Sequence, residues 1–377
     1  MSFDFDVIRD RRGTNSVKWD RFPEEYLPFF IADMDFPVAP PIINALERKI
    51  SKGFFGYDFP GTKSYDSVIS WFRSRYSFEI ESDWIVWIPG IVPSLNVASS
   101  MADSGSVLTL TPNYSLLLSA PLNAGKKRID VPLRLIDSRY EIDFDALESS
   151  CTPDVKIFLQ CNPHNPVGRQ YTREELDKIG AFCERHDLLL VSDEIHNELS
   201  FDRLHIPAVT LGDSVRNRSI TLMSPAKICN MPSLPIAFAI IPNPEIRKSF
   251  QTHGYALSHP GSLEHAACIA SYSECDDWKA ELVDYLKGNR DLLEREIASR
   301  FPGAIMPRIE ATAIAWIDFR PLGIRDPYHF FYENAKVVLS DGKGFAGEGF
   351  VRLNFGCRRA MLIEALDRME NAVKTLI

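Results

Sequence analysis

Five short, uninterrupted apolar runs in the middle of the chain constrain its fold more than any other feature. They are rich in Val, Ile and Leu, and polar loops or helical patterns separate them. Continuous apolar runs of this length are typical of β-strands buried on both faces, which occur in parallel sheets covered by helices. The runs are SVLTL (106–110), VKIFLQC (155–161), LLLVS (188–192), SITLM (219–223) and IAFAII (236–241). They predict an α/β fold with a mostly parallel sheet.

The segment between the second and third runs has the pattern of an amphipathic helix. Thr172 and Glu175 have the S/T-x-x-E spacing of a capping box, in which each side chain satisfies a backbone N–H at the helix start. The apolar residues that follow form one stripe at helical spacing: Leu176, Ile179, Phe182 and Cys183. A strand–helix–strand unit implies parallel pairing with a right-handed crossover.

The pattern changes after about residue 260. A mostly helical stretch is followed by three short apolar runs between turns, and an amphipathic helix ends the chain. The three runs are TAIAWIDF (312–319), AKVVLS (335–340) and FVRLNFG (350–356), and the helix is RAMLIEALDRMENAVKTLI (359–377). The length of 377 residues allows about two to three domains. We expect a large domain over residues 46–275, a smaller α+β domain over 276–377, and an N-terminal arm of residues 1–45 that packs with the smaller domain.

Charge and cysteine content exclude several classes of protein. The formal net charge of −9 disfavours nucleic acid as a partner, because phosphate binding needs a basic surface. No apolar run approaches 18 residues and the N-terminus has no apolar core of a signal peptide, so no membrane partner is expected. The 7 cysteines show no metal-ligand spacing and indicate reduced thiols in a cytoplasmic protein without a metal site.

Polar side chains follow four of the predicted strands at the point where each strand ends. In open parallel sheets, ligands bind outside the carboxyl ends of the strands. Tyr114 follows the first run, Asn165 the second, Asp193 the third and Lys227 the fourth. An aromatic ring, an amide, a carboxylate and a lysine are therefore expected at one edge of the sheet.

Lys227 is isolated in the apolar stretch TLMSPAKICNMPSL, and its nearest basic neighbours are Arg218 and Arg247. Pyridoxal 5'-phosphate (PLP) requires this combination of groups. Its aldehyde forms a Schiff base with a lysine, its pyridine nitrogen needs a carboxylate, and its phenolic oxygen needs a donor. Its ring accepts an aromatic stack, and its phosphate suits hydroxyl groups and a helix N-terminus. The strand ends therefore indicate a PLP site.

The motifs FGY, NPHNPVG, VSDEIH, SPAK and RLNF occur in this order along the chain. Together they resemble those of fold-type I PLP-dependent enzymes of the class I/II aminotransferase superfamily. The segments IADMDFPVAP and GIVPSLNVA, with the DEIH variant, resemble the branch of cystathionine β-lyases and cysteine-conjugate C–S lyases. The resemblance covers about residues 30 to 360. It implies a large domain with a mostly parallel seven-stranded sheet, a smaller α+β domain and a homodimer with shared active sites.

The resemblance also implies roles for five residues around the cofactor ring. Lys227 is the expected catalytic lysine that forms the Schiff base. Asp193 is expected to pair with the pyridine nitrogen and Asn165 to bond the phenolic oxygen. His196 stands where many aminotransferases have a tyrosine, and Tyr114 is expected to stack on the ring.

Five further residues are implied for the phosphate and the amino-acid substrate. Ser224 is expected to bind the phosphate together with the backbone N–H groups of Ile91 and Val92. Arg352 is expected to bind the substrate α-carboxylate through its planar guanidinium. Tyr57 is expected to reach into the site of the neighbouring subunit as a catalytic and substrate-binding residue.

One departure from the superfamily concerns the phosphate. Many members carry an arginine eight residues after the lysine, whereas this chain has Pro235 there. No basic residue lies between Lys227 and Arg247, so phosphate binding is expected to depend on hydroxyl and amide groups.

The residues alone leave alternatives open. Asp193 can also be the N-cap of a helix after its strand, and Lys227 can be an ordinary surface lysine. His196 and His164 can be structural histidines, and Tyr57 can serve aromatic packing.

The resemblance implies a C–S β-lyase that acts on cystathionine or related cysteine S-conjugates and releases a thiol, pyruvate and ammonia. Transamination of a small or aromatic amino acid is the alternative, because the same residues serve both reactions. A protein kept only for binding is disfavoured because Lys227, Asp193 and Arg352 are all present. A nicotinamide dehydrogenase is disfavoured because no GxGxxG follows an early strand.

Overall fold

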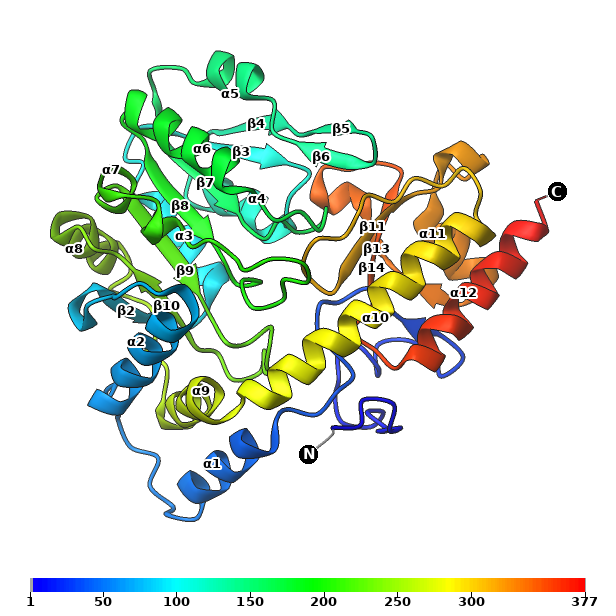
Figure 1. Cartoon of the computed structure of the whole chain (residues 1–377), viewed down its shortest axis with the longest axis horizontal. Helices are drawn as coiled ribbons and strands as arrows, with labels where there is room; N and C mark the ends of the chain where they lie inside the picture. Colours follow the sequence, from blue (N-terminus) through cyan, green and yellow to red (C-terminus); the bar gives the residue numbers. More distant parts are fainter. Residues whose placement is uncertain (1–2, 377) are drawn as a thin grey trace.

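A seven-stranded sheet forms the centre of the larger part of the computed structural model, which describes residues 3–376 (Figure 1). The four pairs among β9, β8, β7, β3 and β4 are parallel, whereas β10 is antiparallel to both of its neighbours. All five apolar runs are strands of this sheet, and the mostly parallel α/β prediction is confirmed. In spatial order the strands are β2 (Ile85–Ile88), β10 (Ala237–Ile240), β9 (Ser219–Met223), β8 (Leu189–Asp193), β7 (Val155–Cys161), β3 (Ser106–Thr111) and β4 (Arg128–Pro132).

The two faces of the sheet are both buried, because alternate residues of each strand enter different cores. In β7, Phe158 packs with Leu176 and Phe182 of α6 (Arg173–Arg185). Ile157 instead packs with Leu95 of α3 (Ile91–Ser100) on the other face. This alternation explains why the strands read as continuous apolar runs. The remaining helices of this part are α1 (Pro40–Ile50), α2 (Thr62–Tyr76), α4 (Ser115–Asn123), α5 (Phe144–Ser150), α7 (Asp213–Arg216), α8 (Pro244–His253) and α9 (Ser262–Glu274).

The predicted capping box begins α6. The Glu175 N–H donates to Thr172 Oγ1 at 3.2 Å, and the Thr172 N–H donates to Glu175 Oε2 at 2.7 Å. The helix connects β7 to β8, which are parallel neighbours, as the strand–helix–strand pattern predicted.

The C-terminal part has a small antiparallel sheet in the order β11 (Ile314–Asp318), β14 (Phe350–Asn354) and β13 (Ser340–Asp341). Three helices accompany it: α10 (Asp276–Arg300), α11 (Pro327–Ala335) and α12 (Arg359–Lys374). The long helix α10 runs from α9 to this sheet and so connects the two parts (Figure 1).

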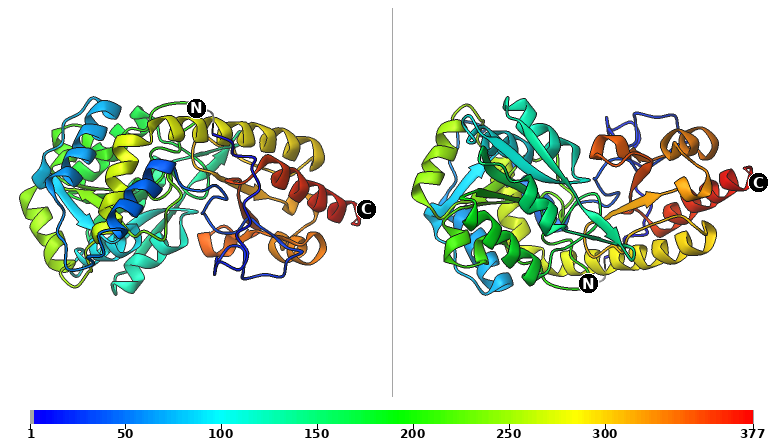
Figure 2. Two further views of the ribbon diagram at one scale, coloured as in Figure 1. Left: turned by 90° about the horizontal axis from the view of Figure 1, so that it is seen from below. Right: turned by 90° about the horizontal axis from the view of Figure 1, so that it is seen from above.

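The apolar run 335–340 does not form one strand. Ala335 ends α11, and Val337–Val338 form β12, which pairs in parallel with β1 (Leu27–Pro28) of the N-terminal segment. Only Ser340 enters the small sheet, through β13. The pairing partner from the distant N-terminus explains the split. Figure 2 shows the N-terminal segment beside the C-terminal elements. The domain boundaries given above stay a prediction.

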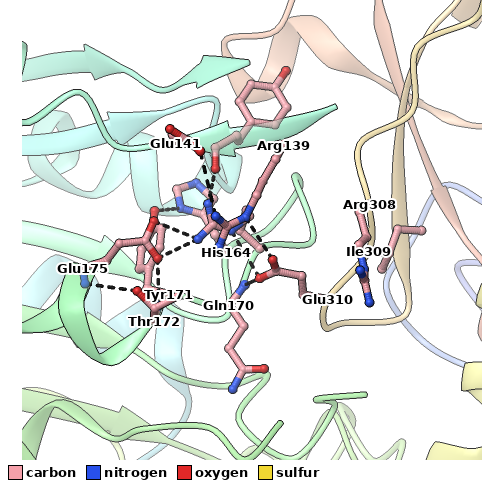
Figure 3. Close-up of polar contacts among 12 residues, drawn as sticks. Arg139, Glu141, His164, Gln170, Tyr171, Thr172, Glu175, Arg308, Ile309 and Glu310 are labelled. Atoms are coloured by element: carbon pink, nitrogen blue, oxygen red, sulfur yellow. Dashed lines mark hydrogen bonds and ion pairs between the residues drawn. The ribbon is translucent and has the colours of Figure 1, made fainter. Parts of the chain in front are cut away.

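A hairpin of β5 (Arg134–Ile136) and β6 (Arg139–Glu141) projects from the large sheet. Beside it, a cluster of ion pairs joins the loop after β7 to the segment before β11 (Figure 3). Glu310 accepts hydrogen bonds from Arg139 Nε at 3.2 Å, from Arg169 Nε at 3.3 Å and from the Gln170 N–H at 2.9 Å. Arg169 is 1% exposed, and its Nη2 also donates to both carboxylate oxygens of Glu175 in the capping box, at 2.8 and 2.7 Å. The cluster therefore fixes the loop that carries Asn165. No helix among residues 3–376 is long and apolar enough to cross a membrane.

Candidate active site

A cavity of about 600 Å³ lies at the carboxyl ends of the central parallel strands. It is within the usual size range for small-molecule sites. All but one of the predicted site residues line it: Ile91, Val92, Tyr114, Asn165, Asp193, His196, Ser224, Lys227 and Arg352.

Tyr57 is the exception, because it does not line the cavity of its own chain. It is fully exposed in the loop between α1 and α2, next to the exposed rings of Phe54, Phe55 and Phe59. Its role at the site of a neighbouring subunit stays a prediction.

Lys227 lies four residues after β9 and is partly accessible from the cavity. Its Nζ donates a hydrogen bond to the Ala32 carbonyl oxygen at 2.6 Å. Burial, followed by the nearby Arg352 guanidinium, lowers the pKa of Lys227 to about 8, while Asp33 and Asp193 oppose this shift. The amine therefore loses its proton far more readily than that of a surface lysine.

Asp193 is the last residue of β8 and is 2% exposed. Burial raises the pKa of its carboxyl group to about 7, against the opposing effect of the Ile195 N–H, which donates to Oδ1 at 3.1 Å. The Asp193 side chain therefore caps the turn after β8 and also lines the cavity. Its interpretation as a cap is thus compatible with its interpretation as a cofactor-binding residue. Such a carboxylate needs a cation beside it to stay ionised at neutral pH.

His196 is buried, and its Nδ1 has no hydrogen-bond partner within residues 3–376. Burial lowers the pKa of the imidazole to about 3, with Lys227 and Arg352 acting in the same direction. The ring that lines the cavity is therefore neutral at pH 7. His164, by contrast, uses both ring nitrogens on Tyr171 and Pro112, each at 2.7 Å.

Arg352 is 6% exposed, and all of its hydrogen-bond partners in the described part of the chain are uncharged. Its guanidinium donates to Asn165 Oδ1 at 3.2 Å, to the Phe30 carbonyl oxygen at 3.0 Å and to Ser340 Oγ at 3.3 Å. Burial lowers its pKa to about 10. An unneutralised buried cation at a cavity is suited to an anionic ligand.

The N-terminus of α3 opens onto the cavity. Gly90 precedes it with φ of 138°, a conformation that favours glycine, and no side chain caps the first turn. The N–H groups of Ile91 and Val92 are thus placed as an anion site requires. The hydroxyl of Ser224 donates to the Ile236 carbonyl oxygen at 2.6 Å and accepts from the Ala226 N–H at 3.1 Å, so it would have to release one bond to donate to a phosphate. Pro235 lines the same end and adds no charge.

Residues 31–33 line the cavity as part of the segment 30–36, for which no site role was predicted from the sequence. Side chains from distant parts of the chain bind its successive carbonyl oxygens. Arg352 binds Phe30, Asn354 binds Ile31 and Asp33, Lys227 binds Ala32, and Asn230 binds Met34 and Phe36. These partners lie some two to three hundred residues from the segment along the chain. In the sequence, only the resemblance of the motif that begins IADMDF pointed to this segment.

The residues of the cavity fit PLP. The cavity presents an amine of lowered pKa, a carboxyl group that needs a cationic partner, a neutral imidazole ring and an uncapped helix N-terminus. These groups complement the aldehyde, the pyridine nitrogen, the polar ring substituents and the phosphate of the cofactor.

This fold and cavity define a fold-type I PLP-dependent enzyme. Residues 31–369 match the sequence model of aminotransferase class I and II, and the chain belongs to this PLP-dependent family. The chain is 34% identical to "Cystathionine beta-lyase PatB" of Bacillus subtilis, over 98% of this chain and 99% of the relative. The crystal structure of OvoB superposes with a TM-score of 0.95 at 38% identity and covers 99% of this chain and 100% of that one. The PLP-bound C–S lyase of Staphylococcus hominis superposes with a TM-score of 0.92 at 29% identity and covers 99% and 98%.

Proposed function

We propose that this chain is a C–S β-lyase that cleaves cystathionine or related cysteine S-conjugates to a thiol, pyruvate and ammonia. The observation that carries the proposal is the similarity to a cystathionine β-lyase over 98% of this chain and 99% of the relative. The arrangement of Lys227, Asp193 and Arg352 in one cavity supports it, because a reaction of α-amino acids needs all three groups.

Lys227 would bind the cofactor covalently through Nζ, and Asp193 would face the pyridine nitrogen. The amide nitrogen of Asn165 would lie toward the phenolic oxygen, because its Oδ1 is already bonded to Arg352. Tyr114 would stack on the ring, and the start of α3 would face the phosphate. When bound, PLP supplies an electron-withdrawing ring that accepts the electron pair left by removal of the substrate α-proton.

Arg352 would hold the α-carboxylate of the substrate and so orient its Cα–H bond within the cavity. Lys227 Nζ, when free, would take the α-proton. Its pKa of about 8 leaves part of the amine neutral near pH 7 while it remains a competent acid for returning a proton. The Cβ–S bond then breaks, and its electron pair leaves with the sulfur. Water converts the remaining three-carbon fragment to pyruvate and ammonia.

We further propose a homodimer in which Tyr57 of one chain completes the site of the other. Tyr57, Phe54, Phe55 and Phe59 are all more than half exposed in one loop. Such an aromatic cluster is typical of a surface that a partner covers. The cysteines in residues 3–376 are all free thiols, which supports a reducing, cytoplasmic location.

The proposal is tested by incubating the PLP-loaded protein with L-cystathionine and measuring pyruvate, ammonia and free thiol. We expect the three products in equal amounts, and no pyruvate from the Lys227→Ala protein. Amino transfer to a 2-oxo acid is measured in parallel. Stoichiometric transfer without pyruvate would instead assign the aminotransferase alternative.

A further inference from the structure

Lys227 and Arg352 are both hydrogen-bonded to one short backbone segment, residues 30–36. Lys227 Nζ donates to the Ala32 carbonyl oxygen at 2.6 Å, and Arg352 Nη2 donates to the Phe30 carbonyl oxygen at 3.0 Å. The position of this segment therefore affects where the amine lies relative to the guanidinium. The segment lies between β1 and α1 and belongs to no helix or strand, so other parts of the chain must hold it in place.

Asn354 holds the backbone on both sides of Ala32. Its Nδ2 donates to the Ile31 carbonyl oxygen at 2.7 Å and to the Asp33 carbonyl oxygen at 2.6 Å, and its Oδ1 accepts from the Gly356 N–H at 2.9 Å. Both amide hydrogens are thus used within the protein. Asn354 is 2% exposed and, among the described residues, is not one that lines the cavity, so its influence on the site would pass through the segment that it binds.

Asn230 holds the other end of the segment, and it lies three residues after Lys227. Its Oδ1 accepts from the Met34 N–H at 2.8 Å, and its Nδ2 donates to the carbonyl oxygens of Met34 at 2.8 Å and of Phe36 at 2.7 Å. Its φ of 51° is left-handed, a conformation that asparagine adopts more readily than most residues. Each of the two functional side chains is thus followed, within three residues, by an asparagine that binds the same segment.

We propose that Asn354 and Asn230 are positioning residues for the amine of Lys227. By holding the segment, they keep the Ala32 carbonyl oxygen where it directs Nζ toward the α-proton of a substrate bound by Arg352. The carbonyl oxygen can do so whenever Nζ is not bound to the cofactor. This inference rests on the proposed function only for removal of the α-proton, a step that the lyase and the aminotransferase share.

The first test is the pKa of Lys227 in the cofactor-free protein. It is measured from the rate at which acetic anhydride labels Nζ at each pH, followed by mass spectrometry of the peptide. A carbonyl oxygen stabilises an ammonium more than a neutral amine, so its release in Asn354→Ala should lower the pKa by about one unit. Burial and the Arg352 guanidinium lower this pKa in both proteins, and Asp33, which raises it, would move away with the carbonyl oxygen.

The second test follows removal of the α-proton directly. L-Alanine has no group on Cβ that can be eliminated, so exchange of its α-proton in D₂O, measured by NMR with the PLP-loaded protein, reports this step alone. In Asn354→Ala we expect the exchange rate at saturating alanine to fall by about tenfold or more, because a misplaced amine meets the proton less often. KM for alanine should change by less than about threefold, because Arg352 keeps Asn165 and Ser340 as partners.

Asn289→Ala is the matched control. Asn289 is buried, and its Nδ2 likewise donates to two carbonyl oxygens with one residue between them, those of Phe355 at 3.2 Å and Cys357 at 2.8 Å. Its replacement should lower the free energy of unfolding, as Asn354→Ala does. The pKa of Lys227 and the exchange of alanine should stay at their wild-type values.

Asn230→Gly is a second variant that should show both changes, and it carries the test if Asn354→Ala does not fold. It removes the side-chain bonds at a φ that glycine adopts without strain. A wild-type value of either measurement in the folded variants, or equal changes in the control, overturns the positioning role and leaves the lyase function standing. No pyruvate from cystathionine with the wild-type protein, with both changes present in the variants, overturns the lyase function and supports the positioning role.

Discussion

The buried carboxyl group of Asp193 destabilises the protein until a cation is placed beside it. Its pKa is raised from 3.8 to about 7 by burial. Below pH 4 both the folded and the unfolded chain hold the proton. Between pH 4 and 7 only the folded chain keeps it, so the contribution of Asp193 to stability falls as the pH rises, and the full cost is present above pH 7.

We therefore expect Asp193→Asn to stabilise the cofactor-free protein above pH 7 by on the order of 4 kcal/mol, because the amide stays neutral. The gain should disappear below about pH 4. The same variant loaded with PLP should lose most of its kcat, because an amide cannot hold the pyridine nitrogen protonated. Denaturant unfolding across this pH range and steady-state kinetics are the measurements.

Asp187→Asn is the control for this prediction. Its side chain is 95% exposed just before β8, so the free energy of unfolding should change by less than about 0.5 kcal/mol. A pH-independent difference between wild type and Asp193→Asn would contradict the proposed cost of burial.

The sequence was sufficient to predict which residues of the central sheet meet at the cavity. Asp193 ends a strand, Lys227 and Asn165 follow one, and parallel strands place their carboxyl ends at one edge. The segment 30–36 could not be placed at the cavity in this way. Partners some two to three hundred residues away hold its backbone there, and no local pattern encodes those contacts.

At the scale of elements, the Glu310 cluster holds the loop after β7 against the segment before β11 (Figure 3). The Glu310 side chain is 13% exposed and forms ion pairs with Arg139, Arg169 and Arg203. Removing it leaves Arg169 buried with only Glu175 as its acidic partner.

We expect Glu310→Ala to lower the free energy of unfolding by about 3 kcal/mol, the cost typical of breaking a buried ion pair from one side. Glu174→Ala is the matched control. Glu174 pairs with Lys178 on the exposed face of α6, where solvent screens the pair, so its removal should lower the free energy of unfolding far less. Chemical denaturation of both variants measures the difference, and equal losses would contradict a structural role for the cluster.

Helices and strands could be predicted from the sequence where residues close together in the chain mark them. Thr172 and Glu175 marked the start of α6 because a capping box is local chemistry. The run 335–340 was not resolved into elements by its pattern, because β12 exists only through its pairing with β1, some three hundred residues earlier in the chain. Two-residue strands of this kind carry no periodicity to detect.

At the scale of the whole molecule, the exposed loop between α1 and α2 is the feature that a single chain leaves unexplained. Phe54 and Phe59 are each 84% exposed, and Tyr57 is fully exposed. Large aromatic side chains are usually far more buried than this in a folded chain. The proposed homodimer accounts for them if the loop packs on a second copy and Tyr57 enters the partner's cavity.

Mixed dimers test this sharing of sites. Lys227→Ala and Tyr57→Ala chains are each expected to be nearly inactive when pure, because every site lacks one of the two groups. When the two chains are unfolded together and refolded, a mixed dimer contains one site with Lys227 from one chain and Tyr57 from the other. Half of the dimers should be mixed, so about one quarter of all sites should regain activity, in the manner of symmetric two-fold assemblies. Sedimentation confirms that dimers form. If Tyr57 serves its own chain instead, the intact pair never assembles and mixing restores nothing.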